Sequence, residues 1–391
     1  MKVVYLDNNA TTAVAPEVLE VMLPFLRDRY GNPSSMHTFG GTVAHDIRKA
    51  REQVAALIGA EPDEIIFTSC GTESDVSAIR SGLETDPAKR HIVTTRVEHP
   101  AVHSFCRWLA DHGYRVTEIS VNPEGLLDLA EVEAALALDT AIVTVMHANN
   151  ETGVLFPIER IAEMCRERGI LFHTDAVQSV GKLPLDLKRT AVDMLSLSGH
   201  KLHAPKGVGV LYVRKGTRFT PCMIGGHQEH GRRAGTENVA SIVALGKAAE
   251  LAKNAMADEN TRVPALRDRL EKELLARIPD SRRNGNARER LPNTSNISYE
   301  FVEGEAILLL LDQAGICASS GSACTSGSLE PSHVLRAMGI PFTFAHGSIR
   351  MSLSRYNTDA DVDAVIASLP GIIQRLRSIS PFTRDNPATG G

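Results

Sequence analysis

Lys201 stands between two apolar, strand-like segments in the stretch SLSGHKLHAPKGVGVLYV (196–213). An exposed lysine usually lies on a helix face, where its ammonium group stays hydrated. A lysine held between buried strands is partly desolvated, which favours the neutral, nucleophilic amine. Lys206, in the Pro-Lys-Gly turn of the same stretch, is the competing candidate, but a surface turn suits it better. The predicted chemistry is therefore that of a lysine amine.

The stretch SCGTESD (69–75) is expected to form a turn from a strand into a helix. Gly71 allows a ligand to approach the backbone closely, and the amides and hydroxyl around Thr72 would lie at a helix N-terminus, which attracts anions. A plain helix cap formed by Thr72, with Glu73 in the first turn, explains the same residues. Both interpretations stay open for this stretch taken alone.

Asp175 ends an apolar segment in FHTDAVQSVGK (172–182), and Gln178 follows it. An acid there fits a turn residue, a metal ligand or the partner of a protonated ring nitrogen. Asp175 precedes Lys201 by 26 residues, so the two are expected at neighbouring strand ends. An anion-binding turn, a carboxylate and an amine are what pyridoxal phosphate requires for its phosphate, its pyridine nitrogen and its aldehyde. The combination predicts this cofactor.

Three further residues lie where a ligand could reach them. His99, in RVEHPAV, is either a helix-cap histidine or a ring that stacks on the cofactor and moves protons. Asn150, in HANNETG, is a turn residue or a donor to a substrate carboxylate. Arg350 lies inside the apolar strand GSIRMSLS, where a guanidinium needs an anion, and its planar fork suits the α-carboxylate of an amino acid.

Seven short, mostly continuous apolar runs alternate with helical patterns from residue 64 onward, and they are expected to hold these side chains. Strands of this kind are covered on both faces, as in a mainly parallel sheet flanked by helices. Such sheets bind ligands at the carboxyl ends of their strands. The sequence thus predicts an α/β fold with a seven-stranded sheet. The runs are EIIFTS, HIVTTRV, RVTEIS, AIVTVMHA, ILFHTD, DMLSLSG and GVGVLYV.

The pattern changes after a long helical stretch that includes ALRDRLEKELLARI. We expect a large α/β domain over 15–255 and a smaller α+β domain over 256–380, with the segment 1–14 packing against the smaller one. NTSNISY and GSIRMSLS are its predicted strands, and GEAILLLLDQAG and DADVDAVIASLPGIIQRLRSI its predicted helices. The tail 381–391 lacks apolar periodicity and is expected to be disordered.

Composition excludes several classes of protein. The formal net charge is −5 with mixed signs and no long basic run, which argues against nucleic-acid binding. The longest apolar stretch, AILLLL, is too short to cross a bilayer. The beginning MKVVYLDNNATT lacks the layout of a secretion signal, so a soluble, cytoplasmic protein is expected. No cysteine and histidine spacing fits structural zinc, and no metal is predicted.

Cys324 stands in SSGSACTSGS (319–328), a run of small residues with almost nothing to bury. Ser and Gly at this density predict a mobile loop, and about ten such residues span roughly 15–20 Å. Four of the other five cysteines have a plainer interpretation as small buried hydrophobic residues, namely Cys106, Cys165, Cys222 and Cys317.

Taken in order, these motifs resemble those of the cysteine desulfurases, class-V enzymes of the aminotransferase fold type I that use pyridoxal phosphate. The resemblance runs from residue 6 to about 355 and is greatest to the nitrogen-fixation, NifS-like branch. The matching motifs are LDNNATT, GNPSS, TSCGTESD, VEHPAV, ANNETG, HTDAVQ, SGHKLHAPKGVG, RAGTEN and SSGSACTSGSLEPSHVLRAMG.

The resemblance implies a role for each site residue in holding the cofactor. Lys201 would bind the aldehyde covalently, Asp175 would pair with the pyridine nitrogen and His99 would stack on the ring. Gln178 would hydrogen-bond the ring hydroxyl. Thr236, in RAGTEN, would reach the phosphate of a partner subunit, which implies a homodimer with composite sites. The phosphate would be held within one chain by Gly71, Thr72, Ser198 and His200.

The resemblance also implies the reaction. Asn150 and Arg350 would bind the carboxylate of L-cysteine, Lys201 would remove the Cα proton, and Cys324 would take the sulfur as a persulfide, leaving L-alanine. An iron–sulfur scaffold protein, for nitrogenase maturation, would receive the sulfur, with at most transient contact between Cys324 and iron. The alternatives are a housekeeping iron–sulfur desulfurase, a selenocysteine lyase or aminotransferase of the same fold, and a sulfur carrier without catalysis.

Overall fold

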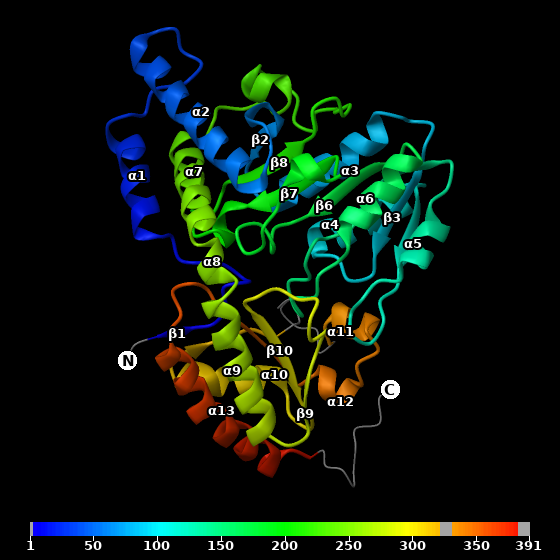
Figure 1. Ribbon diagram of the computed structural model, residues 1–391, viewed down its shortest axis with the longest axis vertical. Coiled ribbons are helices and arrows are strands. Elements are labelled where there is room, and N and C mark those ends of the chain that lie inside the picture. The colour runs from blue at the N-terminus through cyan, green and yellow to red at the C-terminus, as the bar shows by residue number, and fades with distance from the viewer. Residues whose placement is uncertain (1–2, 321–330, 382–391) are drawn as a thin grey trace.

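The computed structural model describes residues 3–320 and 331–381. Figure 1 shows two parts, one above the other. The chain begins in the lower part with β1 (Val4–Tyr5), enters the upper part at α1 (Pro16–Arg27), and returns through α8 (Met256–Glu259) and α9 (Arg262–Arg277). The structure therefore consists of two parts, and the chain passes from one to the other twice.

The upper part is built on a seven-stranded sheet in the order β2-β8-β7-β6-β5-β3-β4. All its strands are parallel to one another except β8, which runs antiparallel to both neighbours. The seven apolar runs form these strands, so the predicted α/β fold with a mainly parallel sheet is confirmed. The strands are β2 (Ile65–Thr68), β3 (His91–Thr95), β4 (Arg115–Ile119), β5 (Thr140–Thr144), β6 (Leu171–Asp175), β7 (Met194–Ser198) and β8 (Gly209–Val213).

Alternate residues of these strands enter two separate apolar cores, one on each face of the sheet. Ile92 packs with helices α3 and α4 on one face, and its neighbour Val93 packs in the larger core with α2, α6 and α7 on the other. This follows from the two-residue repeat of a strand, and it explains why the runs are continuously apolar. The helices are α2 (Thr38–Ile58), α3 (Gly71–Glu84), α4 (Pro100–Asp111), α5 (Leu129–Ala135), α6 (Ile158–Glu167) and α7 (Val239–Asn254).

The lower part has an antiparallel sheet in the order β12-β10-β9, with a third apolar core. Strand β1 pairs in parallel with β11, and Leu6 lies in this core. The boundaries expected at 15, 256 and 381 stay predictions. The elements are β9 (Ser281–Arg283), β10 (Thr294–Tyr299), α10 (Gly304–Gln313), β11 (Ile316–Cys317), α11 (His333–Ala337), α12 (Phe342–Ala345), β12 (Ser348–Ser352) and α13 (Asp359–Ile379).

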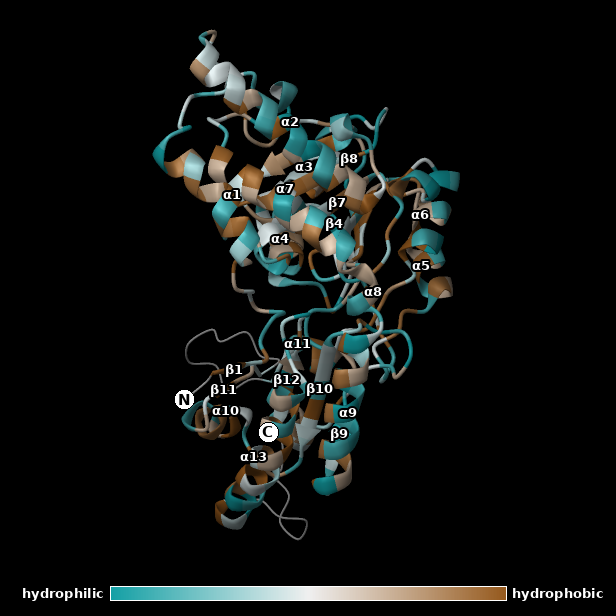
Figure 2. Cartoon of the chain, turned by 60° about the vertical axis from the view of Figure 1, so that its left-hand side comes forward, coloured by the Kyte–Doolittle hydropathy of each residue, from teal (hydrophilic) through white to brown (hydrophobic). Residues whose placement is uncertain are grey.

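Many helices around both sheets bury one face only. Figure 2 shows brown, apolar residues and teal, polar residues alternating along α9 and α13. Leu270 and Leu274 of α9 and Val362 and Leu369 of α13 are fully buried in the lower core. Within the described ranges, no helix is long and apolar enough to cross a membrane.

Two of the predictions about cysteines are wrong. Cys106 and Cys165 are buried, but Cys222 and Cys317 are only partly so. Cys317 belongs to the two-residue strand β11, whose one partner, β1, is equally short, and Cys222 lies in the loop after β8. Neither a two-residue strand with a single partner nor a loop covers a side chain on all sides, so both thiols stay partly exposed. Cys324 and residues 382–391, and with them the predicted mobile loop and disordered tail, lie outside the described residues.

Candidate active site

A cavity of about 300 Å³ opens at the carboxyl ends of the parallel strands. Its walls come from the turns that follow β2, β3, β5, β6 and β7, and from the N-terminal segment at Ala10. This is the sheet edge at which the sequence predicts ligand binding. Nine of the predicted residues line the cavity: Gly71, Thr72, His99, Asn150, Asp175, Gln178, Ser198, His200 and Lys201.

Lys201 ends a short 3-10 helix, Gly199–Lys201, in the return from β7 to the antiparallel β8. Its Nζ donates hydrogen bonds to the backbone oxygens of Asn9 and Ala10, the latter at 2.6 Å. The turn after Lys201 is fixed at His203, which has a left-handed φ of 64° and donates its N–H to Thr12 Oγ1 at 2.9 Å. Both ends of this turn are therefore held by the N-terminal segment.

The electrostatic surroundings of Lys201 favour its neutral amine. Burial lowers the pKa of Lys201 to about 7, assisted by the positive charges of Lys182 and Arg350 and opposed by Asp175 and Asp7. A neutral amine has two N–H donors and one lone pair. The carbonyl oxygens of Asn9 and Ala10 use both donors, so the lone pair is left for a carbonyl carbon or a proton. Lys206, by contrast, is exposed, as a surface turn predicts.

Asp175 is buried at the end of β6. Its Oδ1 accepts a hydrogen bond from the backbone N–H of Val177 at 2.9 Å. Burial raises the pKa of Asp175, against the opposing effects of His99, the Val177 amide and Lys201. A buried carboxylate in this state gains from a further positive charge, such as a protonated ring nitrogen in the cavity.

The N-terminus of α3 faces the cavity without a side-chain cap. The cap residue is Cys70, whose side chain makes no capping hydrogen bond, so the interpretation of Thr72 as an ordinary cap is wrong. At Gly71 an added Cβ would lie 2.9 Å from Val177 Cγ2, so any other residue would force the Val177 methyl group to shift. Uncapped amides at the start of a 14-residue helix suit an anionic group.

The two cavity histidines are held by hydrogen bonds and shifted towards the neutral state. His99 is the N-cap of α4, where its Nδ1 accepts a hydrogen bond from Ala101 N at 3.2 Å. Burial lowers the pKa of His99, against the effect of Asp175. Burial, with the charge of Lys201, lowers the pKa of His200 to about 4, and its Nδ1 lies 3.1 Å from Thr11 Oγ1. Each ring therefore acts as a neutral donor or acceptor.

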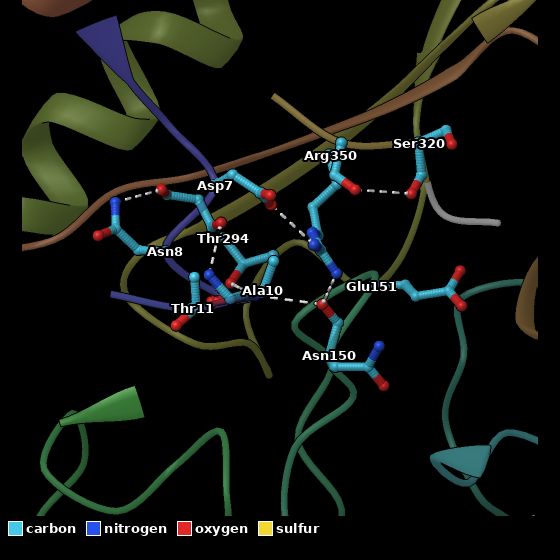
Figure 3. Close-up of polar contacts among 12 residues, drawn as sticks. Asp7, Asn8, Ala10, Thr11, Asn150, Glu151, Thr294, Ser320 and Arg350 are labelled. Atoms are coloured by element: carbon cyan, nitrogen blue, oxygen red, sulfur yellow. Dashed lines mark hydrogen bonds and ion pairs between the residues drawn. The ribbon is translucent and has the colours of Figure 1, made fainter. Parts of the chain in front are cut away.

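Arg350 lies beside the cavity and is not among the residues lining it. Its Nη2 forms an ion pair with Asp7 Oδ1 at 2.9 Å, and its Nη1 donates to the backbone oxygen of Asn150 at 3.0 Å (Figure 3). The anion that this buried guanidinium meets is thus part of the chain. Its Nε is buried with no partner among the described residues.

Two other predicted residues, Asn150 and Thr236, lie in different cavities. Figure 3 shows the side-chain amide of Asn150 pointing away from Arg350. Thr236 lines a separate cavity of about 170 Å³ together with Arg233 and Glu237. The expectation that Thr236 serves a partner subunit stays a prediction.

The sequence interpretation missed several contributors to the site. Asn9 and Ala10 act through backbone oxygens, which no side-chain motif reveals. Asp7 pairs with Arg350 across 343 positions of the chain. Lys182 is buried and bonded to Gln178. The one available signal was a polar run, DNNATT, directly after a short apolar segment.

The site has features that suit pyridoxal phosphate. It offers a nucleophilic amine, a buried carboxyl that gains from a cationic ring nitrogen, and uncapped helix amides for a phosphate. The cavity volume lies at the lower end of the range for small-molecule sites. Within the described ranges, no cluster of histidine, cysteine and acidic side chains could hold a metal ion.

Comparison with known families agrees with this geometry. The family model "Aminotransferase class-V" matches residues 4–365. The chain therefore belongs to the class-V aminotransferase family, whose members depend on pyridoxal phosphate.

Its relatives narrow the class further. A cysteine desulfurase of Trichormus azollae is 62% identical over 98% of this chain and 96% of its own. The cysteine desulfurase NifS of Azotobacter vinelandii is 59% identical over the same shares. A solved NifS-like protein superposes with a TM-score of 0.90 at 38% identity, covering 96% of this chain and all of that one. Within the family, the chain belongs to the cysteine desulfurases.

Proposed function

We propose that this protein converts L-cysteine to L-alanine and passes the sulfur through Cys324 to an acceptor protein. The observation that carries the proposal is the half-buried Lys201 amine, whose pKa is lowered to about 7 and whose two hydrogen-bonded carbonyl oxygens leave its lone pair available. The same cavity presents Asp175 and the uncapped start of α3.

Pyridoxal phosphate, when bound, supplies an electron-accepting ring that stabilises negative charge at the substrate Cα. We assign Lys201 to its aldehyde, Asp175 to its ring nitrogen and Gln178 to its ring hydroxyl. His99 would lie against the ring. The phosphate would accept hydrogen bonds from the start of α3 and from the strand end at β7, that is, from Gly71, Thr72, Ser198 and His200.

Lys201 is suited to move a proton. An amine whose pKa lies near 7 exists in both protonation states at neutral pH, so it can take a proton from the substrate Cα and return it. The hydrogen bonds to Asn9 and Ala10 would aim the lone pair. We assign the substrate carboxylate to Arg350 and Asn150, for which Arg350 would offer its unpartnered Nε or exchange Asp7 for the substrate.

Cys324 would be the sulfur acceptor. Its thiolate attacks the substrate sulfur, an S–S bond forms, and the Cβ–S bond breaks with its electron pair left on carbon. A proton then completes the methyl group of alanine. Cys324 lies outside the described residues, so this step rests on the sequence, where the thiol stands among small residues.

The test is a pair of lysine variants. Lys201→Ala should lower alanine formation at least about 10²-fold, the usual contribution of a positioned general base, and lose covalently bound cofactor. Lys206→Ala, at the exposed turn, should keep the wild-type rate. Normal turnover by Lys201→Ala would place the amine elsewhere and contradict the proposal.

A second pair of measurements tests the sulfur step. Cys324→Ala should bind the cofactor and cysteine but form neither persulfide nor alanine, and mass spectrometry of the unmodified chain after brief exposure to cysteine should find one added sulfur on Cys324. Formation of alanine without a keto-acid separates this activity from transamination. Normal sulfide release by Cys324→Ala would remove the thiol from the reaction.

The biological setting is proposed from similarity. The 59% identity with NifS of Azotobacter vinelandii supports sulfur supply to an iron–sulfur scaffold for nitrogenase, as against housekeeping assembly. We also propose a homodimer in which Thr236 serves the phosphate of the partner. Light scattering and a Thr236→Val variant, with cofactor affinity as the readout, test this arrangement. The cytoplasmic location stays a prediction.

A further inference from the structure

Lys182 is a buried lysine to which the proposed reaction gives no role. It lies in the segment after β6, with 7% of its surface exposed. Its Nζ donates to the backbone oxygen of Gln178 at 2.9 Å and to the side-chain Oε1 of Gln178 at 3.3 Å. A lysine is almost never fully buried unless its ammonium group is paired.

The contacts of Lys182 lead to Lys201. Gln178 Nε2 donates to the backbone oxygen of Asn9 at 3.0 Å, and the same oxygen accepts from Lys201 Nζ. Lys182 and Lys201 also line one small cavity of about 10 Å³. The two amines are therefore connected through one side-chain amide and one carbonyl oxygen.

We propose that Lys182 is a positioning residue for the Lys201 site, because its ammonium group fixes the Gln178 amide with Oε1 turned inward and Nε2 turned towards Asn9 and the cavity. In the flipped orientation, the Gln178 NH₂ would face the donating ammonium group, and its oxygen would face the Asn9 oxygen. Both contacts would be repulsive. Without Lys182, the donor that Gln178 presents at the cavity is no longer fixed.

The positive charge of Lys182 also lowers the pKa of Lys201 and so favours its neutral amine. After burial, it is the largest influence that lowers the pKa of Lys201, followed by Arg350, while Asp175 and Asp7 oppose it. Burial lowers the pKa of Lys182 itself to about 8, against the effect of Glu259, so Lys182 is mostly protonated at pH 7.

The inference rests on the site of the proposed function, but its test does not depend on desulfuration. The full chain, freed of cofactor with hydroxylamine, is labelled with trace acetic anhydride over pH 6–11, and peptide mass spectrometry gives the labelling midpoint of Lys201. In the unmodified chain this midpoint should lie well below 10. In Lys182→Met it should rise by about one pH unit or more, which from a midpoint near 7 means about fivefold less neutral amine at pH 7.

Two controls separate this role from a general structural one. Lys188 lies six residues after Lys182 in the same segment, is exposed and pairs with Glu61. Lys188→Met should therefore leave the Lys201 midpoint unchanged. Lys182→Arg keeps the positive charge, so the Lys201 midpoint should stay close to its lowered value in the unmodified chain. In the holoenzyme, the pH midpoint of the cofactor's visible absorbance should move upward in Lys182→Met.

Three outcomes would overturn the inference. The first is an ordinary Lys201 midpoint near 10.5 in the unmodified chain, a measurement that does not depend on the folding of any variant. The second is an unchanged midpoint in Lys182→Met. The third is an equal shift in Lys188→Met. The second and third outcomes concern only the role of Lys182 and leave the proposed function standing. The first would also remove the lowered pKa of Lys201 on which the proposed function rests, and turnover by Lys201→Ala then tests that function separately.

Discussion

Two buried carboxylates, Glu271 in the lower part and Glu98 beside the active site in the upper part, have opposite surroundings. In the lower part, Glu271 accepts hydrogen bonds from Arg290 at 2.8 and 3.0 Å and from Ser295 at 3.0 Å. Burial would raise the pKa of Glu271, but these bonds and the charges of Arg290 and Arg283 lower it. This carboxylate is fully paired and stays ionised.

In the upper part, Glu98 is buried between β3 and α4, and no cation of the described ranges bonds to its carboxyl group. It accepts from Thr95 Oγ1 at 2.8 Å and from Met146 N at 3.0 Å, and its Oε2 has no partner among the described residues. Burial raises the pKa of Glu98 to about 8. Lys201, shifted in the opposite sense, belongs to the same region. Paired charges therefore mark the framework, and unpaired, shifted ones mark the site.

The largest expected effect is the loss of a paired charge. Glu271→Ala leaves Arg290 buried without its carboxylate and should lower the free energy of unfolding by about 3–5 kcal/mol, measured by urea denaturation. Glu273→Ala, which removes an exposed pair with Arg277 on the same helix, should cost less than about 1 kcal/mol. Equal effects of the two variants would show that the buried pairing of Glu271 contributes no more to stability than an exposed pair.

Glu98, whose carboxyl group is buried and protonated, should make the stability of the protein fall as the pH rises. Its folded pKa of about 8 lies above the unfolded value near 4.5, so its contribution to stability is complete below about pH 4.5 and is lost as the pH rises towards 8. The slope is at most about 1.4 kcal/mol per pH unit for one proton. Glu98→Gln, which imitates the protonated acid, should flatten this slope between pH 5 and 8. Glu84→Gln, at an exposed pair, should retain it.

Glu151 is an intermediate case and should show the smallest effect. Burial raises the pKa of Glu151 to about 7, while a hydrogen bond from Ser332 and the charge of Arg350 lower it. Ser332 also caps α11 by accepting from Val334 N at 3.1 Å. Ser332→Ala should cost about 1 kcal/mol in urea denaturation. The exposed Ser378→Ala, as control, should stay within about 0.5 kcal/mol of the unmodified chain.

What could be predicted from sequence follows the physics of each feature. The seven strands were predictable because strands covered on both faces are continuously apolar. Polar residues at their ends gather because the carboxyl ends of parallel strands meet at one edge, and nine predicted residues do line one cavity. The roles of these residues stay predictions.

The rest depends on contacts that side-chain patterns do not encode. Backbone oxygens of Asn9 and Ala10 hold Lys201, and any residue type has such an oxygen. The pairing of Asp7 with Arg350 joins residues 343 positions apart. The burial of Lys182 contradicts the usual exposure of lysine, so only the three-dimensional structure reveals it.

The N-terminal segment has a mechanical consequence for the reaction. Asn8 N donates to Ser352 O and Asn9 N to Ser352 Oγ, which ties the segment to β12 in the lower part. The next two carbonyl oxygens aim the amine of the upper part. Because Thr12 N also donates to His200 O in the upper part, the direction of the reacting nitrogen is set by a segment anchored in both parts.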